Sequence, residues 1–447
     1  MNEELSSKLW NLSKYIEKEV NESKKNGKAS KIKRIFTKIR VTLDYEKGIV
    51  GLGTSTDLIE KDEWQWEGQL HFIEDIIKHL SEYKEALAEI SARSKIDRLK
   101  ADIVLSAYIQ ILIQKSFEGL TDDALKSYIT YFIEDLEKSL LEWHLKIWID
   151  GIWLENDEYE IYEGFKIRRP VPSDLEIEYP IGFIPYRELP DFNEASNSII
   201  EMTCRTQDDW DVFNEEMKIL LCLGLFRLGS IFSKKTDMYQ KSIFMPGNSR
   251  RYSTITYYPL FKYGLNKKDI PKLHEFIERI KPMLPIRDLK AGSKEVDPIA
   301  IALQRYNEAL SKPDSAESRI TSAMTCFEAL YLKAKERTEL SHKLSQRASA
   351  LLKFHGLNPL EIYYALKQAY DIRSTYVHGS TKQEEYGDVN KLANQIFEYA
   401  RISLLMFLQL KQSISKESLI GKIDRSLLDD ETHDKLKDLI ERNCVIY

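Results

Sequence analysis

The sequence predicts an α+β protein of several domains, with a mixed α/β N-terminal region that contains antiparallel strands and an all-α helical bundle at the C-terminus. The chain has 447 residues, which is long enough for two or three domains. Residues 146–179 alternate apolar and polar side chains as strands do, whereas residues 297–409 repeat apolar side chains at helical spacing. The predicted units are residues 1–143, a helical region with a strand hairpin; 144–284, a β-rich α+β domain; 285–295, a linker; 296–415, the bundle; and 416–447, a helical tail.

The N-terminal unit opens with an amphipathic pattern that predicts a helix over residues 5–20. Residues 35–59 alternate and turn at glycines, which predicts strands. Gly51-x-Gly53 lacks the rest of a phosphate-binding fingerprint, so we assign it to a turn. Two long helices are expected next, over residues 68–115 and 121–143.

The β-rich unit is predicted from the dense alternation of aromatic and branched residues after Lys146. The segment before the bundle combines Pro, Gly and charged residues, which is typical of a linker. The further elements expected in this unit are a strand over residues 196–206, a helix over 208–232, a strand region over 250–262 and a helix over 268–283.

Five helices joined by short loops are expected in the bundle. Their expected bounds are residues 297–310, 314–335, 339–354, 360–377 and 386–409. Cap residues support three of the starts: Asp314 or Ser315 for the second helix, Thr338 or Ser341 for the third, and Asn358-Pro359 for the fourth.

Composition restricts the class of protein. The hydrophobic content of 43% is ordinary for a globular chain, and the net charge of −6 argues against a globally basic nucleic-acid binder. The longest apolar stretch, residues 219–232, is short and contains Arg227, so we expect no membrane span. The acidic start does not resemble a signal peptide, and the four cysteines have no paired spacing. We therefore expect a cytoplasmic protein with reduced cysteines, no metal site and no cofactor.

The motif that points to chemistry is Arg373-x4-His378, at the end of the fourth helix of the bundle. RNA cleavage by its own 2′-hydroxyl needs a base and an acid, and histidine serves as either near neutral pH. Arginine suits the phosphate because its donors form a planar fork. One histidine cannot do both tasks, but a two-fold dimer supplies two. Gly379 fits the position that follows a helix end. Arg337-x4-His342 has the same spacing, but it lies where a helix starts, and we discount it.

Four segments of the bundle, in order, carry a resemblance to a known family: Arg305–Leu310, Ala323–Tyr331, Glu339–Ala348 and Tyr370–Gly379. Together they resemble the HEPN superfamily, most closely its Apea-like branch. The resemblance covers about the last third of the chain. It implies a homodimer in which two Arg-x4-His motifs face each other, metal-independent RNase activity, and use in toxin and anti-phage systems. Some members of the superfamily are inactive.

Other residues near the motif are candidates for supporting roles. Glu328 is expected to be a buried polar partner, and Arg347 has a similar status with some prospect of contacting RNA. The alternative is that Arg373 only pairs with Glu328 or Asp371 and that His378 only satisfies helix-end carbonyls. The remaining supporting candidates are Asp371, which would orient Arg373 or His378, and Ser374, Thr375 and Tyr376, which would bond phosphate or sugar.

Two basic segments outside the bundle are RNA-binding candidates. The first is the run of eight Lys or Arg without an acid between Lys24 and Arg40. We favour a solvated linker leading into a strand over an RNA-binding arm for this run. The second segment is a loop whose neighbouring tyrosines would stack bases, although in a β-rich region such rings more often pack. The candidate residues are Lys31, Lys33, Arg34, Arg250 and Arg251.

The leading hypothesis is a HEPN endoribonuclease that acts as a conditional toxin, or abortive-infection effector, in phage defence. Its expected partners are RNA, a second copy of the chain, and a phage-derived trigger or an antitoxin, with no membrane. The main alternative is an inactive HEPN scaffold that dimerises and binds RNA or a protein. A third hypothesis is a toxin neutralised by a separate antitoxin that modifies Tyr376 or covers the site.

Overall fold

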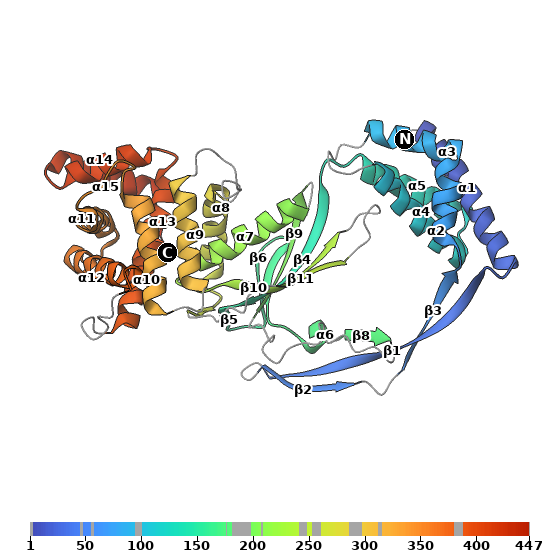
Figure 1. Cartoon of the computed structure of the whole chain (residues 1–447), viewed down its shortest axis with the longest axis horizontal. Coiled ribbons are helices and arrows are strands. Elements are labelled where there is room, and N and C mark those ends of the chain that lie inside the picture. The colour runs from blue at the N-terminus through green and yellow to red at the C-terminus, as the bar shows by residue number, and fades with distance from the viewer. Residues whose placement is uncertain are drawn as a thin grey trace.

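The computed structural model describes residues 3–44, 48–54, 58–93, 101–175, 177–180, 198–206, 209–240, 248–252, 261–285, 297–311, 315–379 and 388–446. Figure 1 shows an N-terminal helical part, a long β arm, a central sheet and a C-terminal helical bundle. The predicted α+β class is confirmed, with antiparallel sheets in the mixed N-terminal region and an all-helical bundle after it.

The N-terminal helices pack around a hydrophobic core of their own. Helix α1 (Glu3–Lys25) lies against α3 (Ser81–Arg93), α4 (Ala101–Glu118) and α5 (Asp122–Leu136). The apolar spacing of α1 creates the stripe that the other helices cover. The buried stripe consists of Leu5, Leu9, Leu12, Ile16 and Val20.

The single long helix predicted over residues 68–115 is wrong. A short helix α2 (Gln69–His71), a π-helical turn (Phe72–Ile76) and a 3₁₀ turn (Ile77–His79) precede α3. Leu80 then adopts an extended backbone with ψ 146°, which ends the helical path before α3 begins.

The β arm is a four-stranded antiparallel sheet built on one long strand. Strand β1 (Ala29–Asp44) pairs antiparallel with β2 (Gly48–Thr54) and β3 (Ile59–Trp66). Strand β8 (Ile177–Pro180) also pairs with β1, at Phe36 through Ile39. Because Phe36 is shared by β3 and β8, and Ile39 by β2 and β8, β8 lies on the opposite edge of β1 from both other strands. Strand β1 begins at Ala29, six residues earlier than predicted.

The central sheet has six antiparallel strands in the order β11-β10-β4-β9-β7-β6. Helices α7 (Asp209–Phe226) and α8 (Ile270–Ile280) lie between this sheet and the bundle (Figure 1). A parallel pair, β5 (Ile152–Leu154) with β12 (Tyr263–Leu265), lies beside it. The strands of the sheet are β4 (Leu141–Asp150), β6 (Glu158–Tyr162), β7 (Phe165–Arg168), β9 (Ser198–Thr206), β10 (Phe232–Gln240) and β11 (Asn248–Tyr252).

Three predictions fail in this region. The helix predicted over residues 208–232 ends at Phe226, and Phe232 already belongs to β10. The helix predicted to reach Trp143 ends at Leu136, because Leu141 and Trp143 belong to the buried alternation of β4. Strand β10 was not predicted at all. Its residues are irregularly buried, and it includes two adjacent lysines, Lys234 and Lys235, so the period of two is weak.

The predicted five-helix bundle is present. Ser315 caps α10 by accepting from the Ser318 amide at 3.2 Å, and Asn358 caps α12 by accepting from the Leu360 amide at 3.0 Å. The cap predicted for α11 is wrong, because Glu339 precedes that helix with φ 55° and no side chain caps it. The helices are α9 (Pro298–Ser311), α10 (Ala316–Tyr331), α11 (Leu340–Leu352), α12 (Pro359–Val377) and α13 (Val389–Leu410), followed by α14 (Lys416–Ser426) and α15 (Asp430–Asn443).

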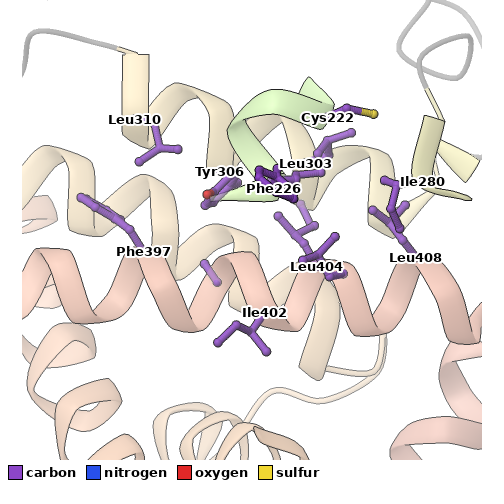
Figure 2. Close-up of a cluster of buried hydrophobic side chains, with 14 of the residues drawn as sticks. Cys222, Phe226, Ile280, Leu303, Tyr306, Leu310, Phe397, Ile402, Leu404 and Leu408 are labelled. Atoms are coloured by element: carbon purple, nitrogen blue, oxygen red, sulfur yellow. The ribbon is translucent and has the colours of Figure 1, made fainter. Parts of the chain in front are cut away.

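The bundle and the central sheet share one hydrophobic core. Figure 2 shows Phe226 of α7 beside Leu303 and Tyr306 of α9, close to α13. The predicted linker therefore joins two units that are packed as one, and all of it except residue 285 lies outside the described residues.

Side chains also bind the end of α7. Its last carbonyl groups lack partners within the helix, as at every helix end. The hydroxyl of Tyr263 donates to the Leu223 carbonyl at 2.8 Å, and that of Tyr306 to the Gly224 carbonyl at 3.3 Å. Arg401 Nη1, from α13, donates to the carbonyls of Leu225 and Phe226 at 2.8 and 3.2 Å. Two of these three donors belong to the bundle, which fixes α7 to it.

Candidate functional site

Arg373 lies on α12 and forms a two-pronged ion pair with Glu328 of α10. Its Nη1 is 2.8 Å from Glu328 Oε1, and its Nη2 is 3.0 Å from Oε2. Burial raises the pKa of Glu328, while the Arg373 charge and a hydrogen bond with Tyr370 offset part of that rise. Glu328 is thus a polar partner of Arg373 inside the bundle, as the sequence suggested. One face of the guanidinium lies 5.4 Å from the Tyr370 ring.

Arg373 still has donors to offer. The pairing uses one proton on each Nη atom, and a guanidinium carries two on each. The side chain is 27% exposed, so a ligand can reach it from solvent. Its Nε is buried and has no partner among the described residues, which shows that Glu328 does not saturate the group.

His378 caps the C-terminus of α12 and is exposed. Its amide donates to the Ser374 carbonyl at 3.1 Å, and Gly379 follows with φ +67°. Gly379 therefore has the left-handed conformation predicted for it. Within the part of the chain that the structure describes, no hydrogen bond or ion pair engages the imidazole. Among the described residues, none therefore competes with a ligand or a second chain for this ring.

The two motif residues do not share one helix face. Five residues correspond to about 140° around an α-helix, so Arg373 and His378 leave α12 in different directions. Asp371, Ser374 and Tyr376 are exposed on the same last turns, and Thr375 is half-buried. Asp371 has no ion pair with Arg373 in the described structure; Glu328 takes that position instead.

Arg347 is committed to the fold. Its Nε and Nη2 donate to Asp424 at 2.6 and 2.9 Å, its Nη1 and Nη2 donate to Glu336 at 2.8 and 2.7 Å, and Nη1 donates to the Tyr331 carbonyl at 2.9 Å. These bonds use all five N–H groups of a guanidinium. No donor remains for a phosphate, so we assign Arg347 a structural role in place of RNA binding.

Three basic residues of β1 form ion pairs with acidic residues of its neighbour β3. The described ion pairs are Lys31 with Asp62 at 2.8 Å, Lys33 with Glu60 at 2.9 Å, and Arg34 with Glu63 at 3.0 Å. The segment is a strand and not the solvated linker that we favoured. Because each of these three cations has a carboxylate partner, this part of the arm offers a polyanion less positive charge than its sequence suggests.

Arg250 and Arg251 belong to β11, where their backbones pair with Asp237 and Thr236 of β10. The structure describes only the backbone of these two residues, so it does not test the predicted contacts of their side chains with RNA. The tyrosines expected to stack beside them lie outside the described residues, apart from the β11 backbone position of Tyr252.

A groove of about 880 Å³, which sequence reasoning missed, lies on the face of the central sheet away from α7. One row of cross-strand neighbours in it alternates in sign, from Asp237 through Lys146, Glu201 and Lys166 to Glu160. Two lysines and four carboxylates line the groove, the fourth being Asp174. This excess of negative charge does not favour the binding of a polyanion such as RNA. The alternation of β4 indicates that Lys146 lies on the polar face of a sheet. The sequence of one strand does not show which residues of neighbouring strands lie beside it, so the groove could not be predicted.

Other kinds of site have little support. Burial raises the pKa of Cys222 to about 12, which keeps this thiol protonated. Among the described residues, no three His, Cys, Asp or Glu side chains are grouped closely enough to hold a metal ion. None of the described helices has the length and apolar character needed to cross a bilayer.

No protein-family model matches the chain, and no curated protein or solved structure shows significant similarity to it.

Proposed function

We propose that the chain is a metal-independent HEPN endoribonuclease that acts as a conditional toxin in anti-phage defence. The observation that carries the proposal is the end of α12, where an accessible arginine and an exposed histidine stand without saturating partners. The four segments that resemble the HEPN superfamily lie in α9, α10, α11 and α12 or at their ends.

The proposed chemistry uses two copies of the motif. His378 of one copy takes the proton from a ribose 2′-hydroxyl, and the 2′-oxygen attacks the adjacent phosphorus. The bond from phosphorus to the 5′-oxygen breaks, and His378 of the second copy protonates that oxygen. The products are a 2′,3′-cyclic phosphate and a 5′-hydroxyl end. Arg373 stabilises the charge that develops on the phosphate oxygens.

The proposed dimer would bury apolar side chains that α12 exposes, which lie in one pair near each end of the helix and not in one contiguous patch. A dimer through α12 would bring together two histidines that a single chain cannot supply. The residues are Leu360 and Tyr364 in the first half of the helix, and Tyr376 and Val377 in its last turn.

The second candidate is an inactive HEPN scaffold that dimerises and binds RNA or a protein partner. The Arg373–Glu328 pair favours it, because the pair links α10 to α12 without any substrate. The exposure of Tyr376 also fits the third hypothesis, in which a separate antitoxin modifies this residue or covers the site.

Cleavage of total cellular RNA in EDTA separates these candidates. The proposal predicts cutting by the wild type that leaves 5′-hydroxyl ends, and loss of cutting in Arg373→Ala and His378→Ala. Equal cutting by all three proteins contradicts it. If all three bind RNA as folded dimers without cutting, the scaffold is supported.

A further inference from the structure

The N-terminal part and the rest of the molecule have separate hydrophobic cores. The chain passes between them once, through residues 137–140, which join α5 to β4. Apart from this link, the substantial contacts between the two parts in the described residues are those of β1 with α6 (Pro172–Leu175) and with β8. Two packed units with one covalent joint are free to reorient unless a second contact prevents it.

That second contact is short. Strand β8 adds four backbone positions to the edge of β1, from Phe36 opposite Pro180 to Ile39 opposite Ile177. So short a strand pairing is marginal by itself in water. The segment that leads into β8 must therefore be fixed by something stronger.

Asp174 of α6 supplies the anchor. Its carboxylate accepts from Arg168 Nη1 and Nη2 at 2.6 and 2.8 Å, from Lys146 Nζ, and from the Val171 amide at 2.8 Å. Arg168 is itself held by Glu201 at 2.7 Å, so the receiving site on the sheet is rigid. The Asp174 side chain is only 7% exposed.

The anchor stays charged over the physiological range. Burial by itself would raise the pKa of Asp174, but the hydrogen bonds from Arg168 and Lys146 lower it to about 2. Removing a buried charge from such a set leaves its partners unpaired, which is costly.

We propose that α6 and β8 form a strap, anchored to the central sheet by Asp174, which holds the N-terminal part in place. When the anchor is released, β8 separates from β1 and the N-terminal part turns about residues 137–140. The inference is independent of whether Arg373 and His378 cut RNA.

The test compares Asp174→Asn with Asp157→Asn in the full chain. Asp157 pairs with Arg169 at 3.3 Å, but its side chain is 92% exposed, so it is a matched control. For Asp174→Asn we expect amide hydrogen exchange at Phe36–Ile39 and Ile177–Tyr179 to accelerate by about tenfold or more. The radius of gyration from X-ray scattering should also increase. Wild-type exchange and an unchanged radius in Asp174→Asn would overturn the proposal.

Two further variants separate opening from unfolding of the sheet. Tyr179→Pro removes an N–H that β8 directs at β1, since Pro180 opposite Phe36 has no N–H and the hydrogen-bonded pair is therefore Tyr179 with Thr37. The anchor stays intact in this variant, so it should open the molecule in the same way. Lys38 and Glu178 lie opposite each other in the register, so Lys38→Cys and Glu178→Cys can form a disulfide between β1 and β8. Added to Asp174→Asn, this disulfide should restore the wild-type radius of gyration when it is oxidised, and its reduction should increase the radius again. If neither variant changes the radius of gyration, the strap does not hold the two parts together.

Discussion

Arg373 and Glu328 form an ion pair through both carboxylate oxygens, at 2.8 and 3.0 Å, and this pair joins α12 to α10. The same arginine is therefore a structural residue and a candidate catalytic residue. Substitutions that separate the two roles are needed to interpret any loss of activity.

Arg373→Ala leaves Glu328 largely buried without its partner. We expect the free energy of unfolding to fall by about 1–3 kcal/mol, measured by urea denaturation. The double variant Arg373→Ala/Glu328→Gln should recover much of that stability, because the unpaired charge is gone. It should still fail to cut RNA. Cleavage by the stable double variant would mean that Arg373 has only a structural role.

Gly379→Ala tests the helix end that presents His378. Nothing lies within 4 Å of a Cβ at Gly379 or Gly356, and their φ angles are +67° and +80°. Each substitution to alanine should therefore cost about 1 kcal/mol through backbone strain alone. Only Gly379→Ala should reduce cleavage, since it shifts His378. Equal activity in the two variants would show that the position of His378 does not matter.

Glu336 links stability to pH. A hydrogen bond from Arg347 lowers its pKa from 4.5 to about 2, against the effect of burial. A carboxyl group with a lowered pKa in the folded state stabilises the fold at neutral pH and loses that contribution as the pH falls from about 5 to 2. Glu336→Gln should be less stable than the wild type by about 3 kcal/mol at pH 7, and the difference should shrink toward pH 2. Glu431→Gln, at an exposed i,i+4 pair, is the control and should show little difference at either pH.

Arg401→Ala tests whether the bundle and the sheet are one unit. Arg401 is buried and joins Glu398 to the end of α7, so its loss should cost about 3–5 kcal/mol. Arg425→Ala, at an exposed position of α14, should change stability by less than about 0.5 kcal/mol. A fragment of residues 297–446 should aggregate, because it exposes the apolar surface that α7 covers. A soluble, cooperatively folded fragment would show that the shared core is dispensable.

The helices of the bundle were predictable because their signals are local. Apolar residues recur at helical spacing, and Ser315, Asn358 and Gly379 mark two starts and one end. The position of His378 at the end of α12 followed from the same signals. Sequence reasoning also placed Glu328 beside Arg373 as one of two possible partners.

The missed features depend on residues far apart in the chain. Arg347 resembled an RNA contact until Asp424 of α14 appeared beside it, 77 positions away. The shared core and the contacts of Arg401 with α7 likewise join segments about 175 positions apart. Periodicity shows which side of a helix is buried but not which element buries it.

The role of His378 is tested by comparing RNA cleavage by the wild type, His378→Ala and His342→Ala in EDTA, with the new 5′ ends identified. His342 has the same spacing from an arginine, but its imidazole is bonded to Tyr363 at 3.0 Å at the start of α11. We expect 5′-hydroxyl ends from the wild type and His342→Ala, and none from His378→Ala. Undiminished cleavage by a folded, dimeric His378→Ala protein would contradict the proposed role of His378.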